Sequence, residues 1–196
     1  MTVAEYTEWL KQSGKWDEFV ERRRVQEEAR LQREVEYQRA EAPLVEELRG
    51  AGYLVDSAWD LVNTHESYAT AVPILLAHLP RPYPGPVREG IARALAVPEA
   101  KVGWRVLTQM YRDEENERAK HGLAIAIAVT ADADVIGEVI DRVRDVRHGE
   151  SRIFLLMALE RSSDRRAHAT LTELASDPDL KKEIRVILRR RRGPKR

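Results

Sequence analysis

The chain has 196 residues, of which 43% are hydrophobic, and its 33 Lys and Arg balance 33 Asp and Glu to a formal net charge of zero. This apolar content is enough for a real core and excludes a fully disordered chain, while the balanced charge counts against a strongly basic nucleic-acid binder. Because the chain has no cysteine, a disulfide scaffold and a thiol-ligated metal site are also excluded.

No segment of the sequence has the features of a signal peptide or a membrane-spanning helix. Residues 1–14 carry early acidic side chains and no apolar run, so no signal peptide is expected. The longest apolar stretch, 123–129, is far shorter than the ~20 residues needed to cross a bilayer. We therefore expect a cytoplasmic protein without membrane contact.

Residues 1–41 predict a charged N-terminal helical extension. From residue 18 onward this region is nearly all Glu, Arg and Gln, with i,i+4 ion pairs such as Glu18–Arg22. Its few apolar residues form one thin stripe. The extension is interpreted either as a cap or arm, or as a helix through which the chain self-associates, although the stripe lacks sustained heptads.

Residues 42–190 contain an internal repeat of amphipathic helices. Apolar residues at i, i+4, i+7 and i+8 return at steps of 32, 30 and 31 residues, in four sets: Val87, Ile91, Ala94, Leu95; Ala119, Leu123, Ala126, Ile127; Gly149, Ile153, Leu156, Met157; and Leu180, Ile184, Ile187, Leu188. An amphipathic helix precedes each set, with core stripes at Val72, Leu75, Leu76, Leu79; Val102, Val106, Met110; Val135, Ile136, Val139, Ile140, Val143; and Leu171, Leu174, Ala175.

A weaker helical pair precedes these four, with stripes at Leu44, Val45, Leu48 and at Val55, Trp59, Val62, Asn63. A hairpin of ~31 residues cannot bury its apolar face alone, so neighbouring hairpins must stack. The sequence thus predicts an all-α protein, a right-handed α-solenoid of about five helical hairpins.

Two segments, AVPILLAHL at 71–79 and GPVREGIARAL at 85–95, resemble a HEAT repeat of the short bacterial kind. The resemblance lies in Pro73 early in the first helix, in Val87 and Arg88 opening the second, and in small residues such as Gly90 along the helix contact. It implies a scaffold, an adaptor or a binding module that recognises a protein partner through its concave surface and needs no cofactor.

Two rows on the second helices and one loop residue are the candidate partner-binding residues. In a stack of hairpins, residues at equal positions form ladders along one edge. The candidates are Arg88, Glu89, Lys120, His121, Glu150, Ser151 and Lys181, together with Tyr83 in the Pro-rich connector 80–86. For the row that contains Arg88, a structural salt-bridge ladder is the alternative, and for Tyr83 it is a packing role.

No catalytic template is present in the sequence. There is no cysteine nucleophile, GxSxG, HExxH or glycine-rich phosphate loop, and the five histidines share no metal-ligand spacing. Asp132 and Asp134 form a DxD pair, which we interpret as a helix N-cap rather than a metal site. We expect no catalytic residue, no metal and no enzymatic activity.

One short segment implies a different function. Residues 59–63, WDLVN, resemble the WDxVD segment of HEAT-like alkylpurine DNA glycosylases, in which the last Asp is the catalytic carboxylate. Asn63 occupies that position and cannot supply a negative charge. The resemblance implies, as the alternative, a DNA-binding or glycosylase-like repair protein.

The end of the chain holds the one strongly basic segment. Residues 185–196 contain seven Arg or Lys and no acidic residue, which leaves residues 1–184 with a formal charge of −7. Residues 191–196 predict a basic tail, and Arg189, Arg190, Arg191 and Arg192 are the candidate nucleic-acid contacts. The acidic body favours a protein partner over a phosphate backbone.

Overall fold

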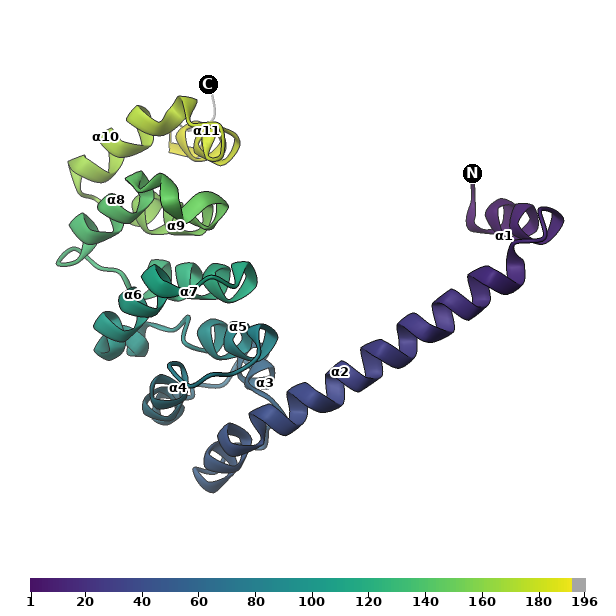
Figure 1. Cartoon of the computed structure of the whole chain (residues 1–196). Helices are drawn as coiled ribbons and strands as arrows, with labels where there is room; N and C mark the ends of the chain where they lie inside the picture. The colour runs from purple at the N-terminus through teal and green to yellow at the C-terminus, as the bar shows by residue number, and fades with distance from the viewer. Residues whose placement is uncertain (192–196) are drawn as a thin grey trace. The chain divides into compact units, whose positions relative to one another are not determined.

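The computed structural model describes residues 1–191, and all regular elements in this part of the chain are helices (Figure 1). The chain divides into two compact units, Met1–Ala40 and a unit that begins at Glu41. None of the helices in the described residues is both long and apolar enough to span a membrane. The predicted all-α class is therefore confirmed.

The first unit starts with helix α1 (Val3–Gln12), which a capping box begins. The Thr2 hydroxyl accepts from the Glu5 N–H, and the Glu5 carboxylate accepts from the Thr2 N–H at 2.7 Å. Gly14, at φ +70°, turns the chain into α2 (Trp16–Gly50). Tyr6 meets Phe19 edge to face at 6.1 Å between ring centroids, so a small aromatic cluster joins α1 to the start of α2.

Helix α2 is solvated over most of its length before Ala40. Ion pairs cover its surface, among them the predicted Glu18–Arg22 at 3.0 Å. The apolar residues Val20, Leu31 and Val35 are 44–50% exposed, so nothing in the described chain covers the stripe. The helix runs without interruption through Pro43, and beyond it the predicted core residues are buried: Leu44, Val45 and Leu48.

The second unit contains nine further α-helices after α2, within the described residues, and four short 3₁₀ helices. They are α3 (Ala58–Val62), η1 (Ala69–Ala71), α4 (Val72–His78), α5 (Gly85–Ala94), η2 (Pro98–Gly103), α6 (Trp104–Asp113), α7 (Glu117–Thr130), α8 (Ile136–Arg144), η3 (Val146–Ser151), α9 (Arg152–Arg161), α10 (Arg165–Glu173), η4 (Leu174–Ser176) and α11 (Lys181–Arg191).

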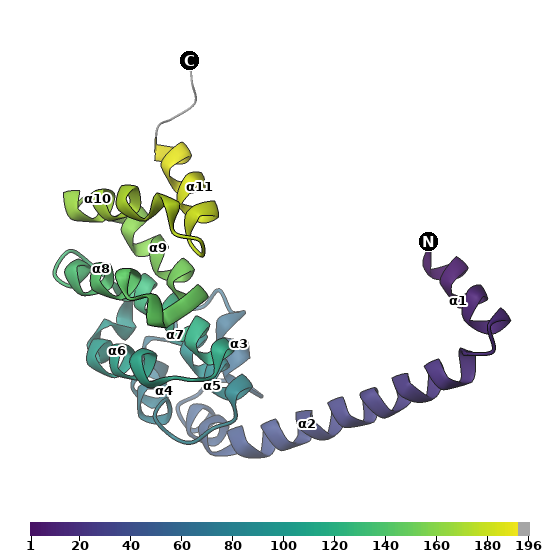
Figure 2. The same ribbon diagram turned by 45° about the horizontal axis from the view of Figure 1, so that its top comes forward.

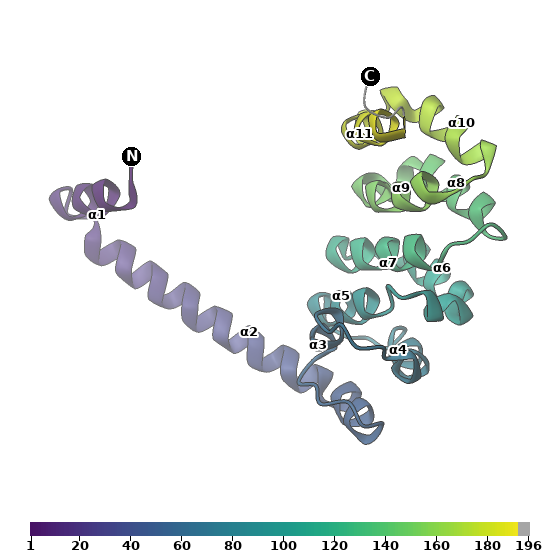
Figure 3. The same cartoon turned by 180° about the vertical axis from the view of Figure 1, so that it is seen from behind.

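These helices form two layers in which neighbours follow chain order. Helices α3, α5, α7, α9 and α11 lie side by side, each in contact with the next (Figure 1). Helices α4, α6, α8 and α10 form the other layer, as the view turned by 45° and the view from behind also show (Figures 2 and 3). Each pair α6–α7, α8–α9 and α10–α11 is in direct contact, so every helix of one layer packs on a sequence neighbour in the other.

Several predicted core stripes are buried as expected. On α5, α7 and α11 the predicted apolar positions face the interior, apart from the half-buried Leu188: Val87, Ile91, Ala94, Leu95, Ala119, Leu123, Ala126, Ile127, Ile184 and Ile187, with Leu180 immediately before α11. On α8 the residues Ile136, Val139, Ile140 and Val143 are buried. Periodicity located these faces on α5, α8 and α11 because their flanking residues are polar, whereas on α7, which is apolar from Leu123 to Val129, the 32-residue step from Val87 gave the register.

The predicted register of α9 is wrong by two positions. Gly149 has φ +56° and lies in η3 before the helix, and the buried face of α9 carries Leu155, Ala158 and Leu159, beside Leu156, which is buried as predicted. Ser151 heads this face and follows Ala119 by 32 positions, as Ala119 follows Val87. The apolar run 153–159 fits more than one helical register, which is why the pattern alone chose wrongly.

Two other stripes were also misplaced. On α6 the core residues are Trp104, Leu107 and Tyr111, whereas Val102, predicted to be buried, lies in η2 with 82% exposure. Short α3 buries Ala58 and Leu61, so Asn63, predicted to face the core, is exposed at its C-terminal end. In both helices the predicted i, i+4 series followed residues at the solvent-exposed edge of the apolar face.

Candidate functional site

On α5 and α9, the residue that follows the first core residue of the helix makes ion pairs to the loop before the next helix of the layer. Arg88 on α5 donates to the Glu114 carboxylate at 2.9 Å, and the Glu114 side chain is only 3% exposed. Arg152 on α9, 1% exposed, donates to the carboxylates of Asp177 at 3.0 Å and Asp179 at 2.9 Å. Each arginine thus reaches the loop that precedes the next helix of its layer, which supports the structural interpretation of this ladder.

The sequence placed Glu150 at the ladder position of α9, and Arg152 was missed. The two-residue register error explains both, because Ser151, not Gly149, heads the core face of that helix. Arg152 also donates to the carbonyl oxygens of Gly149 and Val143, at 3.0 and 3.2 Å. Its guanidinium is therefore fully engaged in holding η3 and α9 to the following loop.

Lys120 on α7 interrupts the ladder. Its ammonium donates to the Glu114 carbonyl at 3.1 Å and lies 5.5 Å from the centroid of the Tyr111 ring, so it contacts its own hairpin. The acidic residue of the next loop, Asp145, is paired instead with Arg147, whose Nε and Nη2 atoms donate to it at 2.9 and 2.7 Å. The Lys120 side chain does not bridge to the loop that carries Asp145, so the space between them remains open as a cleft.

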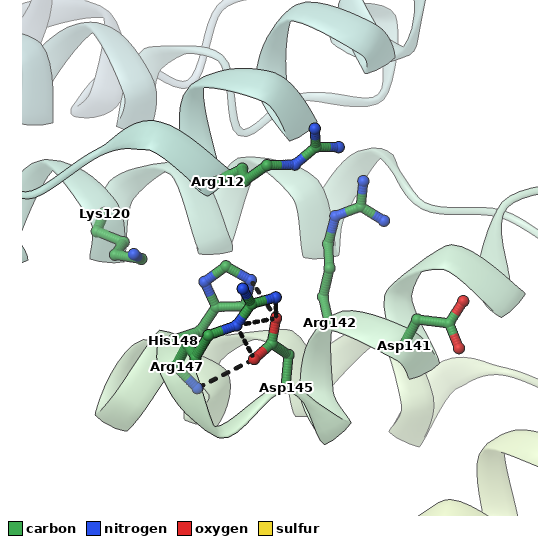
Figure 4. Close-up of a pocket in the computed structure, with 7 residues that line it drawn as sticks. All are labelled: Arg112, Lys120, Asp141, Arg142, Asp145, Arg147 and His148. Atoms are coloured by element: carbon green, nitrogen blue, oxygen red, sulfur yellow. Dashed lines mark hydrogen bonds and ion pairs between the residues drawn. The ribbon is translucent and has the colours of Figure 1, made fainter.

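This cleft, about 360 Å³, lies between the end of α6, the start of α7 and the segment from α8 to η3 (Figure 4). Seven residues line it: Arg112, Lys120, Asp141, Arg142, Asp145, Arg147 and His148. Four of these side chains are basic and two are acidic, so the lining carries an excess of positive charge within an acidic body. A second cleft of about 710 Å³ adjoins it and adds His121, Glu150, Ser151 and the acidic residues 113–115 and 117.

Behind His148, which lines the cleft, lies the buried side chain of Tyr111. The Tyr111 hydroxyl hydrogen-bonds the Ser151 hydroxyl at 2.8 Å, and burial raises the pKa of Tyr111 to about 12, so it stays neutral. The His148 ring packs on Tyr111 at 4.5 Å between centroids. Burial, followed by the nearby Lys120 ammonium, lowers the pKa of His148, which favours its neutral form.

His148 retains unused hydrogen-bonding capacity beside the cleft. Its side chain is 9% exposed, and its Nε2 lies 3.8 Å from the Asp145 carboxylate. Its Nδ1 is buried and has no hydrogen-bond partner in the described chain. Asp145 is fixed as a carboxylate, because hydrogen bonds from Arg147 hold the pKa of Asp145 far below its usual range.

A second surface feature lies on the outer face of α7 and α9. Phe154 packs on the His121 ring at 4.8 Å between centroids. Around this pair, apolar side chains remain half-buried on both helices: Ile125, Val129, Ile153 and Met157. Val186 on α11 is 37% exposed. Charged residues flank the row on α5, where Glu89 pairs with Arg93 at 3.0 Å.

The predicted partner-binding residues do not form one site. Lys120, His121, Glu150 and Ser151 line the two adjoining clefts. Lys181 is half-buried in the first turn of α11, and Arg88 and Glu89 are in the ion pairs described above. Tyr83 is 9% exposed and its hydroxyl hydrogen-bonds His78 Nδ1 at 2.6 Å, so the structure supports its packing role.

The candidate nucleic-acid contacts fall at the end of α11. Arg190 lies 3.5 Å from the Glu160 carboxylate, and Arg191 donates to the carbonyl oxygens of Leu159 and Ser162, at 2.9 and 3.1 Å. Arg189 is exposed on the same turn, and Arg192 lies outside the described residues. At least two of these arginines therefore hold α11 against the preceding hairpin.

The remaining chemical candidates have structural partners. The Asn63 amide donates to the Trp59 carbonyl at 3.0 Å, closing the end of α3. Asp132 and Asp134 both pair with Lys101, and neither is the N-cap of α8, which is Val135. Within residues 1–191 no three His, Asp or Glu side chains lie close enough to hold a metal ion.

Comparison with known proteins gives no relative. No protein-family model matches the sequence, no curated protein matches it, and no solved structure matches the fold. The cleft at Lys120 and the apolar row on α7 and α9 are thus the two features from which a function can be argued.

Proposed function

We propose that this chain is a HEAT-like α-solenoid that binds a protein partner without catalysing a reaction. Two layers of helices in chain order and the 32-residue step from Val87 to Ala119 and Ser151 support this architecture. In such a stack each hairpin buries its apolar face on its neighbours, and the outer faces of one layer form an extended surface. Such a surface suits recognition of a long segment of another protein.

The apolar row on α7 and α9 is the observation that carries the proposal. Leu123, Leu155 and Leu159 already fill the hydrophobic core at this point. The partly exposed side chains of Ile125, Ile153 and Met157 are therefore not needed to complete it. An apolar centre with charged flanks is the usual composition of a protein-binding surface. The basic residues Lys182 and Arg185 on α11 favour a partner segment that is apolar with an acidic flank.

The glycosylase-like alternative is less well supported. It needs a carboxylate at position 63, where Asn63 caps α3 with its amide. A nucleic-acid surface also needs free basic groups, and Arg190 and Arg191 are engaged with the preceding hairpin.

Substitution of the row by charged residues tests the proposal. The full chain is immobilised as wild type, Ile125→Glu, Met157→Glu and Val102→Glu, and each is incubated with the same cell extract. Val102 is the matched control because it is 82% exposed and lies in η2, the segment that connects α5 to α6, rather than on the row. Circular dichroism of each variant confirms the fold.

We expect one protein to be retained by wild type and Val102→Glu and lost with either row variant. Retention by all four proteins would place the binding surface elsewhere, and no saturable retention by wild type would contradict a protein-binding function. Charge reversal of Arg88 would be a poor test, since it leaves the buried Glu114 carboxylate unpaired.

A further inference from the structure

The cleft beside Lys120 holds one arginine without an ion pair in the described chain and one whose guanidinium is only partly engaged. Arg112, at the end of α6, is exposed and forms no ion pair with any residue from 1 to 191, although it lines the cleft. Arg142, on α8, donates through Nη1 alone, to the carbonyl of Glu138 at 2.7 Å and to its carboxylate at 3.3 Å. Both residues line the cleft, and Figure 4 shows their guanidinium groups on the side of the lining away from Lys120.

The charges around the cleft favour an anion. Arg112, Lys120, Arg142 and Arg147 contribute four positive charges, against the lining carboxylates of Asp141 and Asp145 and the Glu138 carboxylate that pairs with Arg142 at 3.3 Å. A phosphate monoester carries about −1.5 to −2 charges at pH 7 and accepts several hydrogen bonds. Guanidinium groups are the side chains best suited to bind it, because they offer paired donors in one plane.

The unpartnered nitrogen of His148 is a second, independent observation. An imidazole nitrogen without a hydrogen bond in a buried position is unfavourable, and most such groups in native proteins have a partner. Figure 4 shows the ring between Lys120 and Asp145, on the wall of the same cleft. An anion held beside Lys120 would supply the missing partner for Nδ1 in the neutral tautomer of His148 that carries its proton on that nitrogen.

We propose that this cleft binds a phosphate group, with Arg112 and Arg142 as its principal ligands and Lys120 and His148 completing the site. The site is separate from the apolar row, so it does not depend on the protein-binding function. The phosphate belongs either to a small molecule or to a phosphorylated side chain of another protein.

Calorimetric titration of the full chain at pH 7.5 and low salt tests the site. The probes are inorganic phosphate, a blocked pentapeptide Ala-Ala-pSer-Ala-Ala, and the same peptide without phosphate. The variants are Arg112→Gln, Arg142→Gln and, as a matched control, Arg144→Gln. Arg144 lies on the same helix as Arg142, is 45% exposed, and pairs with Glu173 away from the cleft.

We expect saturable binding of inorganic phosphate by wild type and by Arg144→Gln, with Arg112→Gln and Arg142→Gln each at least about tenfold weaker. The unphosphorylated peptide should not bind. Phosphopeptide binding tighter than that of phosphate would identify a phosphorylated protein as the source, and equal affinity would identify a small phosphorylated molecule. Absence of saturable binding by wild type, or equal weakening by Arg144→Gln, would overturn the proposal.

Discussion

Individual arginines in this protein have different roles. Arg152 is fully buried and satisfied by two carboxylates and two carbonyl oxygens, so it belongs to the core. Arg112 and Arg142 line the cleft and keep unused donors there. The two kinds of arginine differ in their carboxylate partners. The half-buried Asp177 carboxylate depends on Arg152 for its ion pair, whereas the cleft lining has more basic than acidic side chains.

Replacement of Arg152 by alanine should strongly destabilise the protein. The change removes a buried guanidinium and leaves the Asp177 side chain, 11% exposed, without its partner. We expect the free energy of unfolding in urea to fall by about 3–5 kcal/mol. Arg144→Ala, which removes the exposed ion pair with Glu173, should cost at most about 1 kcal/mol. Equal losses in the two variants would show that burial does not govern the strength of these pairs.

At the scale of helices, the spacing within the layer is set by the residue at each contact. Gly122 lets α7 approach α5 closely, since a Cβ atom there would lie 3.1 Å from both the Ala92 Cβ and the Glu89 carbonyl oxygen. Phe154, 32 positions later, faces α7 with a large ring instead. The layer therefore contains a tight α5–α7 contact, and the next contact includes an aromatic pair at the surface.

A valine at position 122 should separate α5 from α7. Its branched side chain would clash with the Glu89 carbonyl, part of a helix backbone that cannot rotate away, so we expect a loss of about 1–3 kcal/mol in urea unfolding. Gly137→Val is the control, because a Cβ atom on Gly137 would meet no atom closer than 3.6 Å, in the Arg166 side chain. That variant should change stability by less than about 0.5 kcal/mol. A tolerated Gly122→Val would contradict the close packing.

At the scale of the whole molecule, the two units differ in how they are stabilised. The second unit buries most of the core, and before Ala40 the only buried side chain in the chain is Leu10. In α2 up to that point, exposed ion pairs are the main side-chain support, and each contributes little. The uncovered stripe of Val20, Leu31 and Val35 is consistent with the proposal that this helix mediates self-association.

Hydrogen exchange should reveal this difference within a single helix. We expect amides of residues 20–38 to exchange rapidly and those of 44–48, where the side chains of Leu44, Val45 and Leu48 are buried, to be protected together with α7. Exchange measured by mass spectrometry across a range of protein concentrations checks this. Uniform protection along α2 at the lowest concentration would contradict it, whereas protection of 20–38 that grows with concentration would support self-association.

The sequence by itself determined the helical class and most core faces, because amphipathic periodicity is a local property that burial then satisfies. It placed α5, α7, α8 and α11 correctly. It failed on α9, where the run from Ile153 to Leu159 is apolar on all sides and only packing against α7 and α8 selects the buried face.

Only the tertiary structure brought together the residues of the cleft. Arg112, Lys120, Arg142 and His148 lie on four successive elements, and no spacing in the sequence marks them as neighbours. Lys120 and His121 were predicted from their repeat position. That Lys120 does not continue the series of ion pairs depends on which loop each side chain reaches. Local pattern specifies which face a helix buries, whereas the distances between helices specify which polar groups are satisfied and which remain free to bind.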